Sequence, residues 1–325
     1  MKDEVKIVFI GDEGVGKSSF ISTYISKHFS QEVPHVMTDA IIPSEITSDD
    51  VLLTIMDSSS RLMDREVLKL KILSSDAVII LYDITRPETL ENISHVWLPL
   101  VTSLSTTNSN NNNRNDNNYN YNNNNNNNNN YNINNNINND NKNNNNFKPV
   151  IIVGTKTDLL DEEPDLTPMN SLILDFPCIM NNTTCSSFNI QNLDHIIYLS
   201  LSLINYPLYI IFNIIEEEFT PLARYAFQRI FRIYDINNDN LLSDHEIFDL
   251  QLNCFQNHMN NQELTQLKFK ISSIVDHGII NNQISFDGFL GLLKMNIYAY
   301  EYQVPWIILR KCGYNDDLNL EVSEK

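Results

Sequence analysis

Basic residues are scarce in this chain of 325 residues, which carries 22 Lys and Arg against 41 Asp and Glu. The resulting formal net charge of −19 repels phosphate backbones and anionic lipid surfaces. We therefore expect no nucleic-acid binding and no general affinity for membrane surfaces. A hydrophobic content of 42% is ordinary for soluble globular protein, and the length is sufficient for two domains.

Cysteine is also sparse, and no two cysteines form a CxxC pair. The sequence thus favours a reducing compartment over a disulfide framework or a zinc site; the four residues are Cys178, Cys185, Cys254 and Cys312. We also expect no secretory leader, because acidic residues precede the short apolar run at 5–10 and a glycine-rich loop follows it. These absences predict a cytosol-facing protein.

The segment 108–146 consists almost entirely of asparagine. It cannot bury enough apolar surface to offset its conformational entropy, which predicts a disordered surface loop. Loop closure costs little more as a loop lengthens, so a folded domain tolerates such an insert. We interpret it as a neutral expansion, with asparagine-mediated self-association as the alternative.

Outside this insert, strand-like and helix-like stretches alternate. Apolar runs at 5–10, 51–56, 77–82 and 150–154 predict buried strands, and helical patterns start near Lys17, Arg61, Pro87 and Leu166. The alternation predicts an α/β domain with a mostly parallel sheet, whose ligands bind at the carboxyl ends of the strands. Past residue 216 the pattern becomes helix, polar loop, helix, twice over. We predict a nucleotide-binding domain at 1–205, a linker at 206–219, an all-α domain at 220–318 and an acidic tail at 319–325.

A phosphate-binding loop follows the first predicted strand, since Gly11–Ser18 matches GxxxxGK[ST] between a strand and a helix. Its glycines let backbone N–H groups turn toward phosphate oxygens. We expect Lys17 to contact the β- and γ-phosphates and Ser18 to ligate Mg²⁺. The predicted nucleotide-binding residues are Glu13, Gly14, Val15, Gly16, Lys17, Ser18 and Ser19.

A base-recognition element follows the strand at 150–154. Thr155, Lys156 and Asp158 form a TKxD sequence that resembles the [NT]KxD element of the Ras superfamily. The resemblance implies that the Asp158 carboxylate accepts two hydrogen bonds from guanine, which adenine cannot donate. The tripeptide Thr184, Cys185 and Ser186 resembles the loop that lies behind the guanine in the same superfamily. Together these elements predict a small-GTPase domain that binds GTP or GDP.

The switch segments depart from the superfamily pattern. Asp57 is placed to hold the Mg²⁺ ion together with Ser18, and Thr38 is the candidate magnesium-binding threonine of the first switch. Ser60 replaces the glycine that senses the γ-phosphate, and Arg61 replaces the glutamine that orients the attacking water. Glu13 stands where a glycine leaves room for a partner's arginine. We therefore expect firm nucleotide binding and slow GTP hydrolysis, which leaves the enzymatic role open.

A calcium-binding loop is predicted at 235–246, which fits the EF-hand pattern D-x-[DN]-x-[DN]-G-x₅-E. Asn240 replaces the glycine at the sharp turn, and asparagine tolerates positive φ better than other non-glycine residues. One asparagine ligand lowers the ligand charge, which favours sensor-range or weaker affinity. The predicted ligands are Asp235, Asn237, Asp239, the Leu241 carbonyl, Ser243 through water, and Glu246.

A second half-site is expected at 277–288, because EF-hands pair through short strands. The stretch 283–286 is a suitable strand, but carboxylates are absent at ligand spacing. We predict a metal-free structural mate for the calcium loop.

A Rho-like GTPase domain followed by an EF-hand and a silent mate resembles the first half of the mitochondrial Rho (Miro) GTPases. The sequence features that carry the resemblance are Glu32–Pro34, Ile42–Pro43, Asp57–Ser60, Pro221–Leu222, Arg229–Phe231, Phe286–Leu290 and Trp306–Leu318. The resemblance implies a C-terminal helix docked in the EF-hand groove, with Trp306, Ile308 and Leu309 as anchors. It also implies a place on the outer mitochondrial membrane, protein partners of the motor-adaptor type, and a role in mitochondrial transport and homeostasis.

The family continues with further EF-hands, a second GTPase domain and a membrane anchor, whereas this sequence stops at Lys325. We therefore expect membrane association only if another segment replaces the anchor. The apolar stretch at 196–215 is long enough for a span, but its polar residues favour a helix and a packed linker. Three functions stay open: a slow GTPase switch, a calcium-responsive adaptor that holds nucleotide structurally, and a truncated paralogue of low activity.

Overall fold

A computed structural model of the chain describes residues 2–47, 50–111, 148–162, 164 and 166–321. The described residues divide into two compact units, which meet in sequence between Asp194 and His195. The predicted insert at 108–146 lies outside the described residues, except that the helix α4 (Leu98–Asn111) includes its first four positions.

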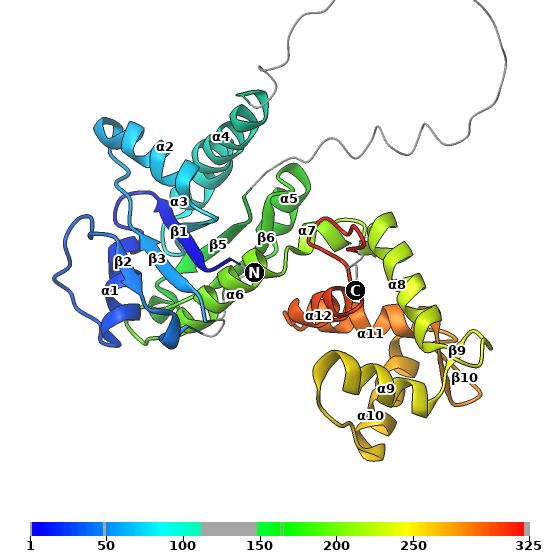
Figure 1. Cartoon of the computed structure of the whole chain (residues 1–325). Helices are drawn as coiled ribbons and strands as arrows, with labels where there is room; N and C mark the ends of the chain where they lie inside the picture. The colour runs from blue at the N-terminus through cyan, green and yellow to red at the C-terminus, as the bar shows by residue number, and fades with distance from the viewer. Residues whose placement is uncertain (1, 48–49, 112–147, 163, 165, 322–325) are drawn as a thin grey trace, which may run out of the picture. The chain divides into compact units, whose positions relative to one another are not determined.

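The first unit is built on a six-stranded sheet with the order β2-β3-β1-β4-β5-β6 (Figure 1). All neighbours pair in parallel except β2 and β3, which are antiparallel. The bounds are β1 Glu4–Gly11, β2 Ala40–Ile42, β3 Leu52–Met56, β4 Ala77–Asp83, β5 Val150–Thr155 and β6 Ile179–Thr184. The four predicted strands are β1, β3, β4 and β5, and their aliphatic runs are almost wholly buried because helices cover both faces of the sheet.

Successive side chains of each strand point to opposite faces of the sheet, and helices pack on both faces. Val8 and Ile80 lie in a cluster with α2 (Arg65–Ser74), α4 and α5 (Pro168–Asp175). On the opposite face, Phe9 packs against Phe20 of α1 (Lys17–Ser26), with ring centroids 4.8 Å apart. The remaining elements are η1 Ser44–Ile46, η2 Leu62–Asp64, α3 Pro87–Asn92, the π-helical turn η3 Ile93–Trp97, and η5 Thr157–Leu159.

The register brings the carboxyl ends of the strands to one edge of the sheet. Gly11 pairs beside Leu81, Asp83 beside Thr155, and Gly154 beside Thr184. Asp57 directly follows β3. Every nucleotide motif predicted from the sequence therefore starts at this edge, which confirms the expected α/β architecture.

The stretch 196–215 forms helices in place of one continuous segment. α6 (Leu193–Asn205) crosses the boundary between the units, and α7 (Leu208–Ile211) leads into a hairpin of β7 (Phe212–Asn213) and β8 (Glu218–Phe219). The predicted linker at 206–219 therefore contains a short helix and a β-hairpin. Throughout the part of the chain that the structure describes, none of the helices is both long enough and apolar enough for a membrane span.

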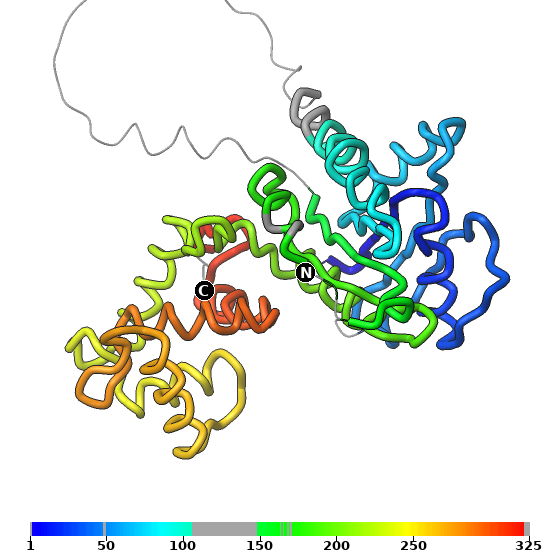
Figure 2. Tube along the Cα trace, turned by 180° about the vertical axis from the view of Figure 1, so that it is seen from behind, coloured from blue at the N-terminus to red at the C-terminus, as the bar shows by residue number. Residues whose placement is uncertain are grey.

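The second unit is two helix–loop–helix motifs joined by a small sheet, drawn from yellow-green to red in Figure 2. The first comprises α8 (Pro221–Tyr234), β9 (Leu241–Leu242) and α9 (Asp244–Phe255). The second comprises α10 (Asn261–Ile274), β10 (Ile279–Ile280), β11 (Gln283–Ser285) and α11 (Phe286–Tyr298). β11 pairs antiparallel with both β10 and β9, so the expected pairing of the two loops is confirmed.

The last helix of this unit, α12 (Gln303–Lys311), packs against α8, α9 and α11. Trp306 and Leu309 are completely buried, and Ile308 is nearly so. These are the three residues predicted as anchors, and the expected docked C-terminal helix is confirmed. After it, the chain turns at Gly313, and Tyr314 forms a β-bridge with Leu320.

Candidate nucleotide and calcium sites

The loop after β1 has the backbone shape of a phosphate cradle. Gly11 has φ 138°, and a Cβ there would collide with the carbonyl oxygen of Leu81. Gly16, the N-cap of α1, has φ 99°, which side chains other than glycine rarely adopt. The loop needs glycine at both positions to turn from β1 into α1, where backbone N–H groups and the helix N-terminus face one space.

Lys17 is buried, and its ammonium closes the loop from within. Its Nζ donates to the carbonyl oxygens of Gly11 at 2.9 Å and Asp12 at 2.8 Å. Burial lowers the pKa of Lys17, while the negative charges of Asp57, Asp12 and Glu13 act in the opposite direction. Two backbone carbonyl groups thus hold the Lys17 ammonium at the phosphate loop.

Ser18 and Asp57 meet at the start of α1. The Ser18 hydroxyl donates to Asp57 Oδ2 at 2.6 Å, and the backbone N–H of Met37 donates to the same oxygen at 2.8 Å. Asp57 is fully buried, and its other oxygen accepts from the N–H of Ser58. No ion pair holds this carboxylate among the residues that the structure describes. The Asp57 carboxylate and the Ser18 hydroxyl are oxygen ligands of the kind that fits a divalent cation.

Thr38 is exposed, and its role as the magnesium-binding threonine stays a prediction. The neighbouring backbone makes the contacts instead: the His35 carbonyl accepts from Ser18 at 3.1 Å, and Met37 donates to Asp57. The first switch is therefore joined to the Ser18–Asp57 pair through its main chain.

The base-recognition residues converge beyond β5 and β6. The Ser186 hydroxyl donates to Asp158 Oδ1, and Ser186 itself is fully buried. Buried Thr155 donates to the carbonyl oxygens of Val15 at 2.7 Å and Tyr82 at 2.9 Å, which ties β5 to the phosphate loop. Cys185 lies behind this site, where burial raises the pKa of its thiol to about 12. Thr184 ends β6 at the same edge.

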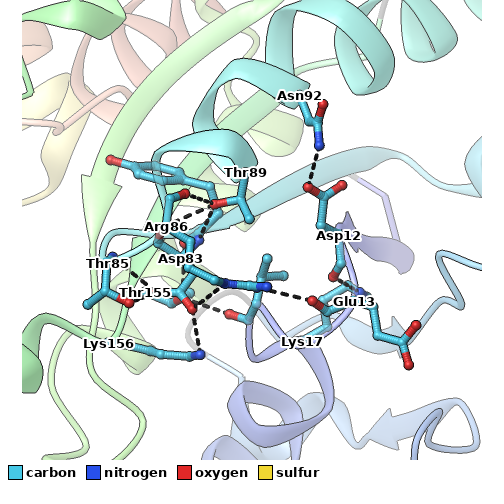
Figure 3. A network of polar contacts seen from close by, with 12 residues as sticks. Asp12, Glu13, Lys17, Asp83, Thr85, Arg86, Thr89, Asn92, Thr155 and Lys156 are labelled. Carbon is cyan, nitrogen blue, oxygen red and sulfur yellow. Dashed lines mark hydrogen bonds and ion pairs between the residues drawn. The ribbon is translucent and has the colours of Figure 1, made fainter.

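Asp83, at the end of β4, organises a charged network that the sequence analysis did not identify (Figure 3). Its carboxylate binds Lys156 Nζ at 2.6 Å and Arg86 Nε at 2.9 Å, and it accepts two hydrogen bonds from Thr85. Arg86 also donates to the carbonyl oxygen of Glu13 at 3.1 Å. The network joins the TKxD element to the phosphate loop.

The pKa of Asp83 reflects this environment. Burial alone would raise it, but hydrogen bonds from Lys156, Thr85 and Arg86 outweigh burial and lower the pKa to about 2. In the sequence, the available indication of this network is the Asp83 carboxylate at the end of β4, the strand that pairs with β5.

The second anchor of the phosphate loop is Asp12. Its two carboxylate oxygens accept from Asn92 Nδ2 at 2.7 Å and Trp97 Nε1 at 2.9 Å (Asn92 is in Figure 3). The loop is thereby fixed to α3 and η3. A cavity of about 430 Å³ lies alongside, between these residues and Arg61–Arg65 of the second switch.

Glu13 of the phosphate loop and Arg61 of the second switch face each other. Arg61 Nη2 lies 3.9 Å from Glu13 Oε1, and His35 Nδ1 lies 3.8 Å from the same oxygen. The side chains are largely exposed, so the attraction is weak. Glu13 nevertheless presents a negative charge beside the phosphate loop and engages the residue that replaces the water-orienting glutamine. Ser58, two residues before Ser60, is held by its hydroxyl on the Phe9 carbonyl at 2.6 Å.

The loop at 235–246 adopts the turns of an EF-hand. Asp235 accepts from the N–H groups of Asp239 at 3.1 Å and Asn240 at 3.0 Å, and Asn240 has the expected positive φ of 64°. Asn237 Oδ1 also accepts from the N–H of Asp239, and Asp239 accepts from that of Leu241.

Glu246 closes this loop from the first turn of α9. Its Oε1 accepts from the N–H of Ile236 at 2.8 Å, and its Oε2 accepts from the N–H and hydroxyl of Ser243. Burial would raise the pKa of Glu246, but these bonds outweigh it and lower the pKa. The first and last predicted ligands thus lie on one loop with the right oxygen chemistry, and the donor set fits Ca²⁺. Among the described residues, however, no three His, Cys, Asp or Glu side chains gather as a metal cluster.

A hydrogen bond and close backbone packing hold the mate loop. The Ser285 hydroxyl donates to the carbonyl oxygen of His277 at 2.9 Å, and Gly288 packs so closely on Gly278 that a Cβ would collide with its carbonyl oxygen. Nearby, buried Lys268 binds the carboxylate of Asp244 and the carbonyl oxygen of Asn282. An ammonium and close backbone packing stabilise this half of the pair.

The phosphate loop, the Ser18–Asp57 pair and the TKxD element on this sheet define a Ras-type nucleotide-binding domain. Comparison with known families agrees: residues 6–112 match the Ras family and residues 257–323 match the family described as EF hand associated.

The chain is similar over nearly its whole length to mitochondrial Rho GTPases. It is 28% identical over 327 residues to the probable mitochondrial Rho GTPase gemA of Dictyostelium discoideum, covering 98% of this chain and 44% of that protein. It is 27% identical to mitochondrial Rho GTPase 2 of Arabidopsis thaliana, covering 98% of this chain and 44% of the relative. Mitochondrial Rho GTPase 1 of the same plant is also 27% identical, with 97% and 43% covered. These findings confirm the resemblance, and the chain spans less than half the length of these relatives.

Proposed function

We propose that this chain is a guanine-nucleotide switch with slow GTP hydrolysis, joined to a calcium-binding EF-hand pair. The observation that carries the nucleotide part is the convergence of three elements at one sheet edge. Lys17 closes the phosphate loop, Ser18 contacts Asp57, and Ser186 contacts Asp158. The Ras-family match over residues 6–112 supports the same assignment.

Each element has a distinct task in this proposal. Lys17 and the N–H groups of residues 13–19 bind phosphate oxygens, and Ser18 with Asp57 supplies oxygen ligands for Mg²⁺, which neutralises phosphate charge when bound. Asp158 accepts from the guanine edge, with Ser186 fixing its carboxylate. Thr155 and Lys156 hold the base-recognition segment against the phosphate loop through Val15 and Asp83.

Slow hydrolysis follows from what the switch residues can offer. Catalysis of phosphoryl transfer depends almost entirely on positioning and electrostatic stabilisation. Arg61 has no oxygen acceptor with which to orient water, and it lies toward Glu13. Glu13 adds negative charge beside the phosphates and occupies space that an assisting arginine needs. Both features lower turnover and leave the binding elements intact.

Calcium binding rests on the loop at 235–246. The oxygen ligands of Asp235, Asn237, Asp239 and Glu246, with the Leu241 carbonyl, would hold Ca²⁺, and Ser243 would act through water. Replacement of one acidic ligand by Asn237 favours an affinity in the range of calcium sensors or weaker. The EF-hand-associated match over residues 257–323 is consistent with a calcium-related unit.

We also propose that the protein acts at mitochondria, facing the cytosol, in transport and homeostasis of the organelle. The support is the similarity to three proteins described as mitochondrial Rho GTPases. Its partners would be protein adaptors or effectors. Fractionation of tagged protein with carbonate extraction tests the location: co-sedimentation with mitochondria before extraction is expected, and a purely cytosolic distribution would contradict it.

The nucleotide proposal is tested by the content of the purified protein. We expect close to one guanine nucleotide per chain, released by chelation of Mg²⁺. Lys17→Ala should abolish retention, whereas Lys27→Ala, which removes an exposed ion pair with Asp194 at the far end of α1, should retain it. Absence of bound and exchangeable guanine nucleotide from the wild-type protein would refute the proposal.

A second candidate is a calcium-responsive adaptor that holds nucleotide only as a structural cofactor. The contact of Glu13 with Arg61 favours it, because both residues are diverted from hydrolysis. Partner capture with GDP-loaded and GTP-analogue-loaded protein separates the two functions. A switch binds its partner differently in the two states, and an adaptor binds equally in both but responds to Ca²⁺.

A further inference from the structure

The peptide that joins Glu13 to Gly14 in the phosphate loop is held by an arginine from another loop (Figure 3). Arg86 Nη2 donates to the carbonyl oxygen of Glu13 at 3.1 Å. The same nitrogen lies 3.7 Å from the position that a Cβ on Gly14 would take. The contact joins residues that are 73 positions apart, and no motif in the sequence analysis includes Arg86.

Arg86 is itself fixed by Asp83. Its Nε donates to the Asp83 carboxylate at 2.9 Å, and its backbone N–H donates to the Asp83 carbonyl oxygen at 2.9 Å. Asp83 is buried, and Lys156 binds the same carboxylate. Because Nε and Nη2 belong to one planar group, anchoring of Nε at Asp83 presents Nη2 to Glu13 in a defined direction.

The hydrogen bond to Glu13 orients a whole peptide plane. In a planar trans peptide the C=O and the N–H point in opposite directions. With the Glu13 carbonyl turned toward Arg86, the N–H of Gly14 points to the other side of the loop. Within the part of the chain that the structure describes, this N–H has no acceptor. It is therefore available to a ligand.

Thr155 acts in the same way on a later peptide of the loop. Its hydroxyl donates to the carbonyl oxygen of Val15 at 2.7 Å, which turns the N–H of Gly16 to the opposite side of that peptide. Arg86 follows β4 and Thr155 ends β5. Two donors outside the loop thus set the directions of two N–H groups of the kind that binds phosphate oxygens.

We propose that Arg86 is a positioning residue that directs the N–H of Gly14 toward a phosphate oxygen of the bound nucleotide. This inference rests on the proposed nucleotide binding and adds a residue to it. The guanidinium lies on the carbonyl side of the peptide, so it acts through the loop and does not itself contact phosphate. A donor that is oriented before binding costs no reorganisation when the phosphate arrives. Loss of Arg86 should therefore weaken the retention of GDP and GTP.

The chain offers a spectroscopic probe of this one peptide. It contains eight glycines, and Gly14 alone follows a glutamate. Full-length protein made by cell-free synthesis with ¹³C-carbonyl glutamate and ¹⁵N-glycine therefore carries one coupled ¹³C–¹⁵N pair, at Glu13–Gly14. In GDP-loaded Arg86→Ala we expect both signals of this pair to shift, because the carbonyl loses its donor and the N–H changes its direction. Lys27→Ala, which removes an exposed ion pair, should leave them unchanged.

Nucleotide release is the second measurement. GDP should dissociate from Arg86→Ala roughly tenfold faster than from the wild-type chain in the presence of Mg²⁺. Arg86→Lys keeps a positive charge beside buried Asp83 and so protects the fold. Its ammonium is a single nitrogen that the charged carboxylate attracts, which leaves the neutral Glu13 carbonyl without a donor. Release from Arg86→Lys should therefore also be faster than from wild type, with a shift of the Glu13–Gly14 signals.

The outcomes separate this inference from the function on which it rests. Release at the wild-type rate from either Arg86 variant would overturn the inference. Faster release without a shift of the Glu13–Gly14 signals would overturn it as well, because Arg86 would then act only on the stability of the fold. A wild-type chain that binds no guanine nucleotide would instead refute the proposed function, and this inference with it.

Discussion

At the scale of single residues, the first unit is organised by two carboxylates with assigned partners, the half-buried Asp12 and the buried Asp83. Asp12 binds Asn92 and Trp97, and Asp83 binds Lys156 and Arg86. A buried charge is tolerated only when it is paired or hydrogen-bonded. These partners therefore determine where the phosphate loop and the TKxD element lie relative to each other.

Removal of the Asp83 charge measures how much this carboxylate contributes to the free energy of unfolding. We expect Asp83→Asn to lose about 2 kcal/mol at neutral pH, because the folded pKa of about 2 lies below the ordinary 3.8 and each pKa unit corresponds to about 1.4 kcal/mol. The folded pKa is depressed, so this stability is present above about pH 4 and is lost as the pH falls toward 2. Urea unfolding across this pH range checks it. The exposed carboxylate variant Asp161→Asn is the control; an equal loss there would contradict the account.

A substitution of Ser186 tests the proposed base-recognition site while the Asp158 carboxylate stays in place. Ser186→Ala deletes the hydrogen bond to Asp158, and a bond of this kind contributes about 1 kcal/mol. We expect guanine-nucleotide affinity to fall roughly 3- to 10-fold. Ser187→Ala, at the next position, should bind as wild type in the same fluorescence titration. Unchanged affinity in Ser186→Ala would separate Ser186 from the base site.

At the scale of elements, one motif serves two purposes in the second unit. Ser243 and Glu246 form a capping box at the start of α9, and Asn260 and Glu263 form another at the start of α10. Only the first box contains predicted calcium ligands, Glu246 directly and Ser243 through water. The two boxes therefore distinguish helix capping from metal binding.

Matched substitutions exploit this difference. Glu246→Gln should weaken calcium binding by roughly tenfold or more, because it removes a charged ligand, while glutamine can still cap the helix. Glu263→Gln should leave calcium affinity unchanged. Isothermal titration of both variants checks this expectation, and equal calcium binding by Glu246→Gln and wild type would contradict the assignment of the loop.

The elements also show what sequence reasoning could reach. Apolar runs predicted β1, β3, β4 and β5, and the phosphate loop, the TKxD element and the mate strand follow from local spacing. The short strand β2 has only three residues, and polar Asn181 to Thr184 conceal β6. The Asp83 network depends on contacts between elements distant in sequence, which no local pattern contains. The contacts of His35 and Met37 are made by backbone, to which side-chain motifs give no guide.

At the scale of the molecule, the described residues form two compact units. A compact unit of domain size can unfold cooperatively. Ligands that bind only one folded unit stabilise that unit. The boundary at Asp194 differs from the predicted one at residue 205, because contacts place most of α6 with the second unit; the predicted boundary stays a prediction.

Calorimetry should reveal this organisation. We expect two thermal transitions, of which GDP with Mg²⁺ raises one and Ca²⁺ raises the other. At 100 times its dissociation constant, a ligand adds about 2.7 kcal/mol to the unit that it binds. Lys17→Ala should abolish only the nucleotide shift, and Glu246→Gln only the calcium shift. A single transition that both ligands raise equally would contradict independent units.

The central claim is that the domain binds GTP firmly and hydrolyses it slowly. Single-turnover hydrolysis by GTP-loaded protein tests it most directly, with Arg61→Gln as the matched variant. We predict a wild-type rate below the value of about 4 × 10⁻⁴ s⁻¹ that is typical of unassisted Ras proteins, and a faster rate in the variant because glutamine can orient water. Wild-type hydrolysis at or above that value would contradict the account.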